Sequence, residues 1–88
     1  MLELLTRIIR VLFPPAFTIT LEEGVARSTQ GKVTGRAVSG FTDVAKQQGI
    51  AKGRIYGVRR GKTVLLRFSS NIPSSARQRF RNVWQMTK

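Results

Sequence analysis

The spacing of apolar residues changes at residue 16 and divides the chain into two parts. Residues 2–13 follow the helical period, with polar side chains on one arc and large apolar side chains on the opposite arc. The apolar arc consists of Leu5, Ile8, Ile9 and Leu12. Pro14 and Pro15 then end the helix, because proline lacks the backbone donor that a helix interior needs. We therefore expect an amphipathic helix and proline break at residues 1–15 and a single basic domain at residues 16–88.

Within the second part, segments of period two alternate with segments of helical period. Alternating or β-rich runs bounded by turn residues predict four strands, at residues 17–22, 25–30, 54–58 and 63–69. Helical spacing predicts two helices, one at residues 35–48 that stops at Gly49 and one from Pro73 to about Met86. The order is hairpin, helix, hairpin, helix.

Four of the predicted elements, two strands and both helices, carry one clear apolar face. The inward residues are Phe17, Ile19 and Leu21, then Ala37, Val38, Phe41, Val44 and Ala45, then Val64, Leu66 and Phe68, and last Ala76, Phe80, Val83 and Trp84. Strands and helices with a single apolar face pack as a sheet covered on one side. The predicted fold class is therefore α+β, a two-layer ββαββα domain with one antiparallel four-stranded sheet, preceded by the short amphipathic helix.

Composition narrows the chemistry of this small domain. The 88 residues include no His and no Cys, which excludes thiolate nucleophiles, Ser-His relays, disulfides and imidazole metal sites. The only acidic residues are Glu3, Glu22, Glu23 and Asp43, too few for a carboxylate metal cage. We expect a module that is not an enzyme and that uses no metal, cofactor or small-molecule substrate.

Positive charge is concentrated in the second half of the chain. Sixteen Lys and Arg against four Asp and Glu give a formal net charge of +12, and no acidic residue follows Asp43. Such an asymmetry costs self-repulsion and indicates a polyanionic partner. Arginine supplies most of the charge, and its planar guanidinium suits bidentate contacts to phosphate.

Two basic features are the candidate polyanion-binding sites. The second hairpin has a basic tip, where we expect Arg54, Arg59, Arg60 and Lys62 to crowd together beside Tyr56, a candidate stacking surface. On the last helix, Arg77, Arg81 and Lys88 form one stripe beside Trp84. The simpler interpretations are a solvated basic surface for the charges and core packing for Tyr56 and Trp84.

The linear pattern of residues 13–85 resembles a family of short bacterial proteins catalogued only as a domain of unknown function. The most specific motifs are a Phe-Ser-x-x-Ile-Pro run at residues 68–73 and a Gln-Arg-x-Arg-Asn-Val run at residues 78–83. The resemblance brings no activity, cofactor or catalytic residue. It implies an N-terminal hydrophobic membrane anchor, whereas residues 2–13 of this chain carry Glu3, Arg7 and Arg10.

Three functions are compatible with these observations. The first is a binding module for nucleic acid or a ribonucleoprotein, with Arg and Lys on phosphates and no sequence-specific reading of bases. The second is a peripheral protein of the cytoplasmic membrane face, anchored by the N-terminal helix and held to an anionic membrane surface by basic residues. The third is a structural subunit that docks on an acidic protein partner. Each predicts a cytoplasmic protein, either free or at the inner face of the membrane.

Overall fold

The computed structural model describes residues 15–88. The predicted amphipathic helix, with its apolar residues Leu5, Ile8, Ile9 and Leu12, lies outside the described residues. The described residues form six elements in the predicted order. These are β1 (Phe17–Glu22), β2 (Val25–Gln30), α2 (Gly35–Gln48), β3 (Gly53–Arg60), β4 (Thr63–Phe68) and α3 (Ser74–Thr87).

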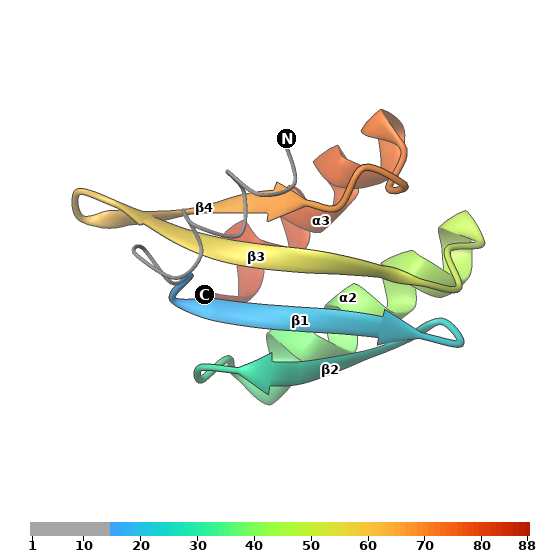
Figure 1. Cartoon of the computed structure of the whole chain (residues 1–88), viewed down its shortest axis with the longest axis horizontal. Helices are drawn as coiled ribbons and strands as arrows, with labels where there is room; N and C mark the ends of the chain where they lie inside the picture. The colour runs from blue at the N-terminus through green and yellow to red at the C-terminus, as the bar shows by residue number, and fades with distance from the viewer. Residues whose placement is uncertain (1–14) are drawn as a thin grey trace, which may run out of the picture.

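The α+β fold predicted from the sequence is confirmed. One four-stranded antiparallel sheet has the strand order β2-β1-β3-β4. Figure 1 shows that α2 and α3 both lie behind this sheet, so the helices cover one face and the described residues place no helix on the other. Since α2 connects β2 to β3, the chain crosses behind β1, and β1 becomes a central strand between β2 and β3.

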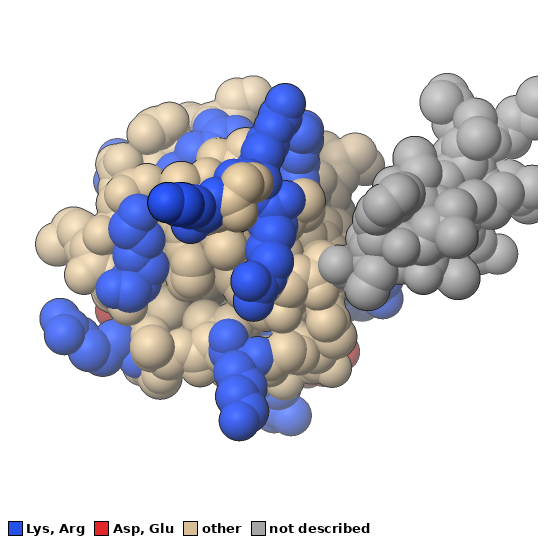
Figure 2. Space-filling view, turned by 90° about the vertical axis from the view of Figure 1, so that its left-hand side faces the viewer, with Lys and Arg blue, Asp and Glu red and all other residues tan. Residues whose placement is uncertain are grey.

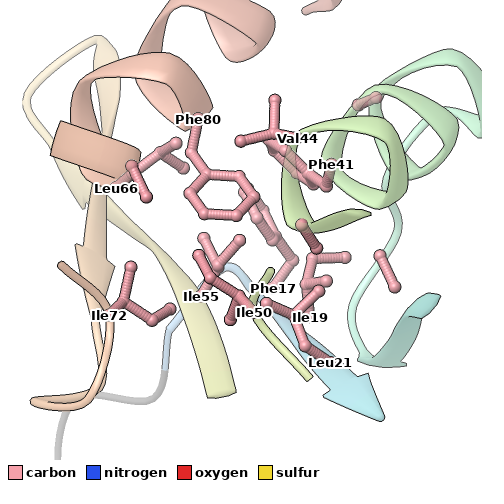
Figure 3. Packing of buried hydrophobic residues seen from close by; sticks show 14 residues of the cluster. Phe17, Ile19, Leu21, Phe41, Val44, Ile50, Ile55, Leu66, Ile72 and Phe80 are labelled. Atoms are coloured by element: carbon pink, nitrogen blue, oxygen red, sulfur yellow. The ribbon is translucent and has the colours of Figure 1, made fainter. Parts of the chain in front are cut away.

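The core lies between the sheet and the two helices. The sheet contributes Phe17, Ile19, Leu21, Ala26, Ile55 and Leu66, the helices contribute Ala37, Phe41, Val44, Ala45, Ala76 and Phe80, and two connections contribute Ile50 and Ile72. Phe80 of α3 and Phe41 of α2 meet edge to face, with ring centroids 5.9 Å apart (Figure 3). Because every inward position of β1 is buried and its alternate positions are polar, the period-two pattern of this strand predicted the buried face correctly.

Helix α2 begins and ends where the sequence predicts. Thr34 is the N-cap and its Oγ1 accepts a hydrogen bond from the backbone N–H of Ala37, at 3.2 Å. Gly49 ends the helix at φ 67°, a left-handed conformation that glycine adopts without steric cost. The N–H of Ile50 then donates to Ala45 O at 2.8 Å, so Ile50 folds back into the core.

Strand β3 is longer than predicted. It runs from Gly53 to Arg60, not to Val58, because Arg60 pairs with Thr63 and leaves a turn of only two residues. Gly61 occupies the first turn position with φ 62°, as a tight hairpin turn requires. The prediction that Arg54 lies at the hairpin tip was therefore wrong, since Arg54 pairs with Thr20 near the opposite end of β3.

The outer edge of β2 is held by a helix side chain. Thr42 Oγ1 of α2 accepts a hydrogen bond from the backbone N–H of Ala26 at 2.9 Å and donates to Val38 O at 3.2 Å. This hydroxyl therefore satisfies a backbone donor that a strand at the sheet edge would otherwise leave unpaired.

Thr42→Val is expected to lower the free energy of unfolding by about 1 kcal/mol, because it leaves the part-buried Ala26 donor without a partner. Urea denaturation followed by circular dichroism measures the change. Thr63→Val is the matched control, since the Thr63 hydroxyl donates to the exposed Arg60 carbonyl, which water can also reach. Equal losses in both variants would contradict a special role for Thr42.

Polar side chains organise the connection from β4 to α3. Ser69 Oγ accepts from the backbone N–H of Arg54 at 2.9 Å and donates to Asn71 Oδ1 at 2.6 Å. Asn71 Nδ2 donates to Lys52 O at 2.6 Å, and the next residue, Ile72, is buried. The Phe-Ser-x-x-Ile-Pro run thus ties the end of β4 to the start of β3 and sets the direction in which α3 begins.

Candidate polyanion-binding surface

Four arginines lie on the sheet face opposite the helices. Directly paired residues of neighbouring strands share a face, so the pairs Arg27–Thr20 and Thr20–Arg54 form one row across β2, β1 and β3. Arg67 of β4 and Arg60 of β3 occupy the same face in later rows. All four are exposed. We call Arg27, Arg54, Arg60 and Arg67 the basic sheet face.

The spacing of these arginines follows from sheet geometry. Arg27 and Arg54 are separated by two strand spacings, about 10 Å at the backbone. Arg54 and Arg67 are diagonal neighbours across β3 and β4, about 7–8 Å apart at the backbone. Guanidinium groups at these separations can contact several phosphates of one chain at once, because each side chain is long and exposed.

Polar side chains fill the space between the arginines. Thr20 Oγ1 and Thr29 Oγ1 share a hydrogen bond of 3.0 Å, and Thr18 Oγ1 donates to Gln30 Oε1 at 2.9 Å. A hollow of about 910 Å³ lies over the end of this face near the β1–β2 turn, and its lining includes Arg27, Lys52 and Arg54 together with the carboxylates of Glu22 and Glu23. Tyr56, the predicted stacking residue, pairs with both Thr18 and Arg67 and is half-buried.

The tip of the β3–β4 hairpin, which includes Arg60, adds two further exposed basic residues at one end of the molecule, Arg59 and Lys62. Figure 2 looks onto this end and shows Lys and Arg side chains spread over it. The C-terminal end of α3 is tied to the start of α2, where Thr34 Oγ1 donates to Thr87 O at 3.3 Å. Figure 1 shows these helix ends on the same side of the molecule as the hairpin tip, so Lys88 belongs to this basic end.

The predicted stripe on α3 lies beside β4 rather than on the basic sheet face. Arg77 and Arg81 both approach the ring of Phe68, with guanidinium carbons 5.7 and 5.4 Å from the ring centroid. Arg77 also donates from Nε to Ile72 O at 2.8 Å and from Nη2 to Ser69 O at 3.3 Å. Arg77 is therefore engaged in holding the β4–α3 connection, whereas Arg81 is exposed.

A family model described as "Protein of unknown function (DUF3634)" matches residues 4–88. The chain belongs to the DUF3634 family. The match begins at residue 4 and so includes most of the N-terminal segment. The resemblance inferred from the sequence motifs covered only residues 13–85. No curated protein and no solved structure matches the chain.

Two further findings concern the described part of this DUF3634 member. No helix within residues 15–88 is long and apolar enough to cross a membrane. Within the same residues there is no group of three or more acidic side chains that could hold a metal ion.

Two residues of the basic sheet face, Arg27 and Arg67, were missed as site residues by sequence reasoning. Alternation with Leu66 and Phe68 did place Arg67 on the face opposite the core. Arg27 gave no such signal, because the alternation in its strand is weak and the residue belongs to the nearly neutral first half of the chain. Only the pairing of β1 with both β2 and β3 brings Arg27 into line with Arg54.

Proposed function

We propose that this DUF3634 protein is a non-catalytic module that binds nucleic acid through its basic sheet face and hairpin tip. The observation that carries the proposal is the alignment of Arg27, Arg54, Arg60 and Arg67 on the sheet face opposite the helices. Arginines from three strands on one rigid surface favour contacts to successive phosphates over a merely solvating role.

The expected mode of binding is electrostatic and independent of base sequence. The basic sheet face and the remaining tip residues, Arg59 and Lys62, provide six cationic groups for phosphate contacts. Each contact releases condensed counterions, so log K should fall with log salt at a slope of roughly −5 on duplex DNA. We propose no sequence-specific reading of bases, because arginine and lysine contact the phosphates.

Removing three arginines from the face tests the proposal. We expect Arg54→Gln, Arg60→Gln and Arg67→Gln together to weaken binding to a labelled duplex by more than about tenfold and to make the salt slope shallower by about 3. Fluorescence anisotropy over a series of salt concentrations measures both quantities. Circular dichroism checks that the variant is folded, which we expect because all three side chains are exposed.

A control variant with the same net charge distinguishes the contribution of this face to binding from the contribution of overall charge. Arg36→Gln, Lys46→Gln and Arg79→Gln together remove the same three charges from exposed positions on α2 and α3. This control should bind the duplex within about threefold of the unmodified protein, since it leaves every proposed phosphate contact in place. Equal weakening in the two triple variants would refute a binding role for the sheet face.

Anionic lipid vesicles provide the competing polyanion. Binding to the duplex with little binding to vesicles of matched charge supports the proposal. Strong pelleting with vesicles and no duplex binding would instead favour the peripheral membrane function, in which Leu5, Ile8, Ile9 and Leu12 insert into the lipid.

A further inference from the structure

A second surface lies between the edge of β4 and α3. It shares Arg67 with the basic sheet face but also has apolar side chains in its lining. It is a groove of about 390 Å³. Apolar side chains of both elements contribute to its lining, namely Val64, Leu66 and Phe68 from β4 and Trp84 from α3. Arg67, Arg77, Arg81 and Gln85 supply the polar part of the lining. A groove with an apolar lining and basic residues beside it suits a ligand that combines apolar and acidic groups.

The backbone of β4 presents unpaired groups along this groove. In the described sheet, β4 is hydrogen-bonded to β3 on one side only. The N–H of Ser69 donates to Arg54 O at 3.0 Å, so by antiparallel alternation Thr63, Leu65 and Arg67 also point their backbone groups toward β3. The N–H and C=O groups of Val64, Leu66 and Phe68 therefore point outward, where a further strand can pair with them.

The two edges of the described sheet differ in whether their outward backbone groups have a hydrogen-bond partner. At the β2 edge, the N–H of Ala26 is bonded to Thr42 Oγ1, and α2 packs alongside the strand. At the β4 edge, Arg77 and Arg81 of the neighbouring helix instead lie over the ring of Phe68. An open edge with an apolar groove beside it is the arrangement used in binding by strand addition.

The positive charge beside the groove favours an acidic segment over a second copy of this chain. A second copy of this chain would bring its own β4, with another Arg67, against the same basic edge, and each copy carries a formal net charge of +12. An acidic segment gains attraction where a second copy meets repulsion. Arg81 is available on the helix side and Arg67 on the sheet-face side, whereas Arg77 already donates to Ile72 O and Ser69 O.

We propose that the groove between β4 and α3 binds an extended acidic segment of a partner protein, which adds to the sheet as a fifth strand next to β4. On its face toward α3 the segment is mainly apolar and contacts Leu66 and Trp84, with one carboxylate next to Arg81. On its opposite face it carries carboxylates that reach Arg67. This inference does not depend on nucleic-acid binding, since it rests on the β4 edge and on α3.

A designed peptide tests the proposal on the full-length protein. At about 3.3 Å per residue, a labelled peptide of about eight residues spans β4. The peptide alternates Glu and Val, and one Val on the side toward α3 is replaced by Glu to lie next to Arg81. We expect saturable binding by fluorescence anisotropy. By amide hydrogen exchange measured with NMR, the backbone N–H groups of Val64, Leu66 and Phe68 should exchange rapidly in the free protein and slowly with peptide bound.

Matched variants on α3 isolate the contribution of charge. Arg81→Gln should weaken peptide binding about fivefold, whereas Arg79→Gln, an equal charge change at an exposed position outside the groove, should change it less than about twofold. A peptide with Lys in place of Glu should not bind. Equal effects of the two arginine variants would overturn the assignment of Arg81.

Two modifications test backbone pairing. A peptide that is N-methylated at every second residue keeps its side chains but loses its donors on one edge, and it should not bind. Val64→Pro removes an outward donor of β4 without affecting the ladder to β3, and it should weaken binding at unchanged secondary structure.

Three results would overturn the proposal. The first is unchanged affinity for the methylated peptide. The second is peptide-induced shifts confined to Arg27 and Arg54, which would mean simple attraction to the basic sheet face. The third is slow exchange of Leu66 N–H in the free protein, which would mean that the edge is already covered. Dependence of that protection on protein concentration would identify a second copy as the occupant.

Discussion

Phe80→Ala is expected to cost about 4 kcal/mol of folding free energy, the largest effect of any single substitution considered for this protein. The side chain is fully buried, at 0% exposure. Its ring lies 5.9 Å from the ring of Phe41 and 5.9 Å from the ring of Phe68, measured between centroids. Removing it leaves a cavity where α3 meets both α2 and β4.

A loss of this size is critical for a small domain in a chain of 88 residues. Small domains are stable by only about 5–15 kcal/mol, so the variant should retain little margin at physiological temperature. We expect the melting temperature to fall by about 20 °C, with a lower urea midpoint and an unchanged m-value. Thermal and urea denaturation followed by circular dichroism measure these shifts.

Met86→Ala on the same helix is the control for Phe80→Ala. Met86 is 80% exposed, so its truncation should change the free energy of unfolding by no more than about 0.5 kcal/mol. A loss below about 1 kcal/mol for Phe80→Ala would contradict the central position of this ring between the helices and the sheet.

Gly57→Ala should destabilise the domain by about 2–3 kcal/mol through overpacking. Gly57 is buried on β3 and pairs with Phe17 of β1. A Cβ at this position would overlap Cε2, Cδ2 and Cζ of the Phe17 ring, far inside van der Waals contact. That ring is 3% exposed and packs against Trp84 with centroids 5.1 Å apart, so it has little room to move away.

Two further variants identify the cause of the loss in Gly57→Ala. Gly35→Ala adds the same methyl group where no atom lies within 4 Å, and we expect it to be neutral or slightly stabilising. Phe17→Leu in the Gly57→Ala background should cost less than Phe17→Leu alone, because the smaller side chain relieves the clash. Strict additivity of the two losses would show that the clash does not explain the effect.

The boundaries of most elements followed from local residue patterns. Helix α2 occupies the predicted residues 35–48, since its apolar spacing is regular and Gly49 is a strong stop signal. Strand β3 was predicted too short because Arg59 and Arg60 were assigned to the turn together with Gly61 and Lys62. Cross-strand pairing of Arg60 with Thr63 keeps them in the strand, and that pairing depends on the partner segment rather than on local preference.

The candidate site residues, like the element boundaries, were only partly predictable from local patterns. The stripe of Arg77 and Arg81 beside Trp84 follows from helical spacing, which is a local property of α3. Their position over Phe68, and the bonds of Arg77 to Ile72 O and Ser69 O, depend on how α3 packs against β4. Sequence reasoning therefore identified these arginines but could not distinguish the engaged Arg77 from the exposed Arg81.

The sequence alone determined the fold class, the inward faces of β1, α2, β4 and α3 and the concentration of positive charge after Asp43, because these depend on residue type and on local period. Only the tertiary structure decided the strand order β2-β1-β3-β4. That order places Arg27 in one row with Arg54 and leaves β4 as an edge beside α3. The physical reason is that strand pairing joins residues far apart in the chain, and the alternation within one strand carries no information about which strand lies next to it.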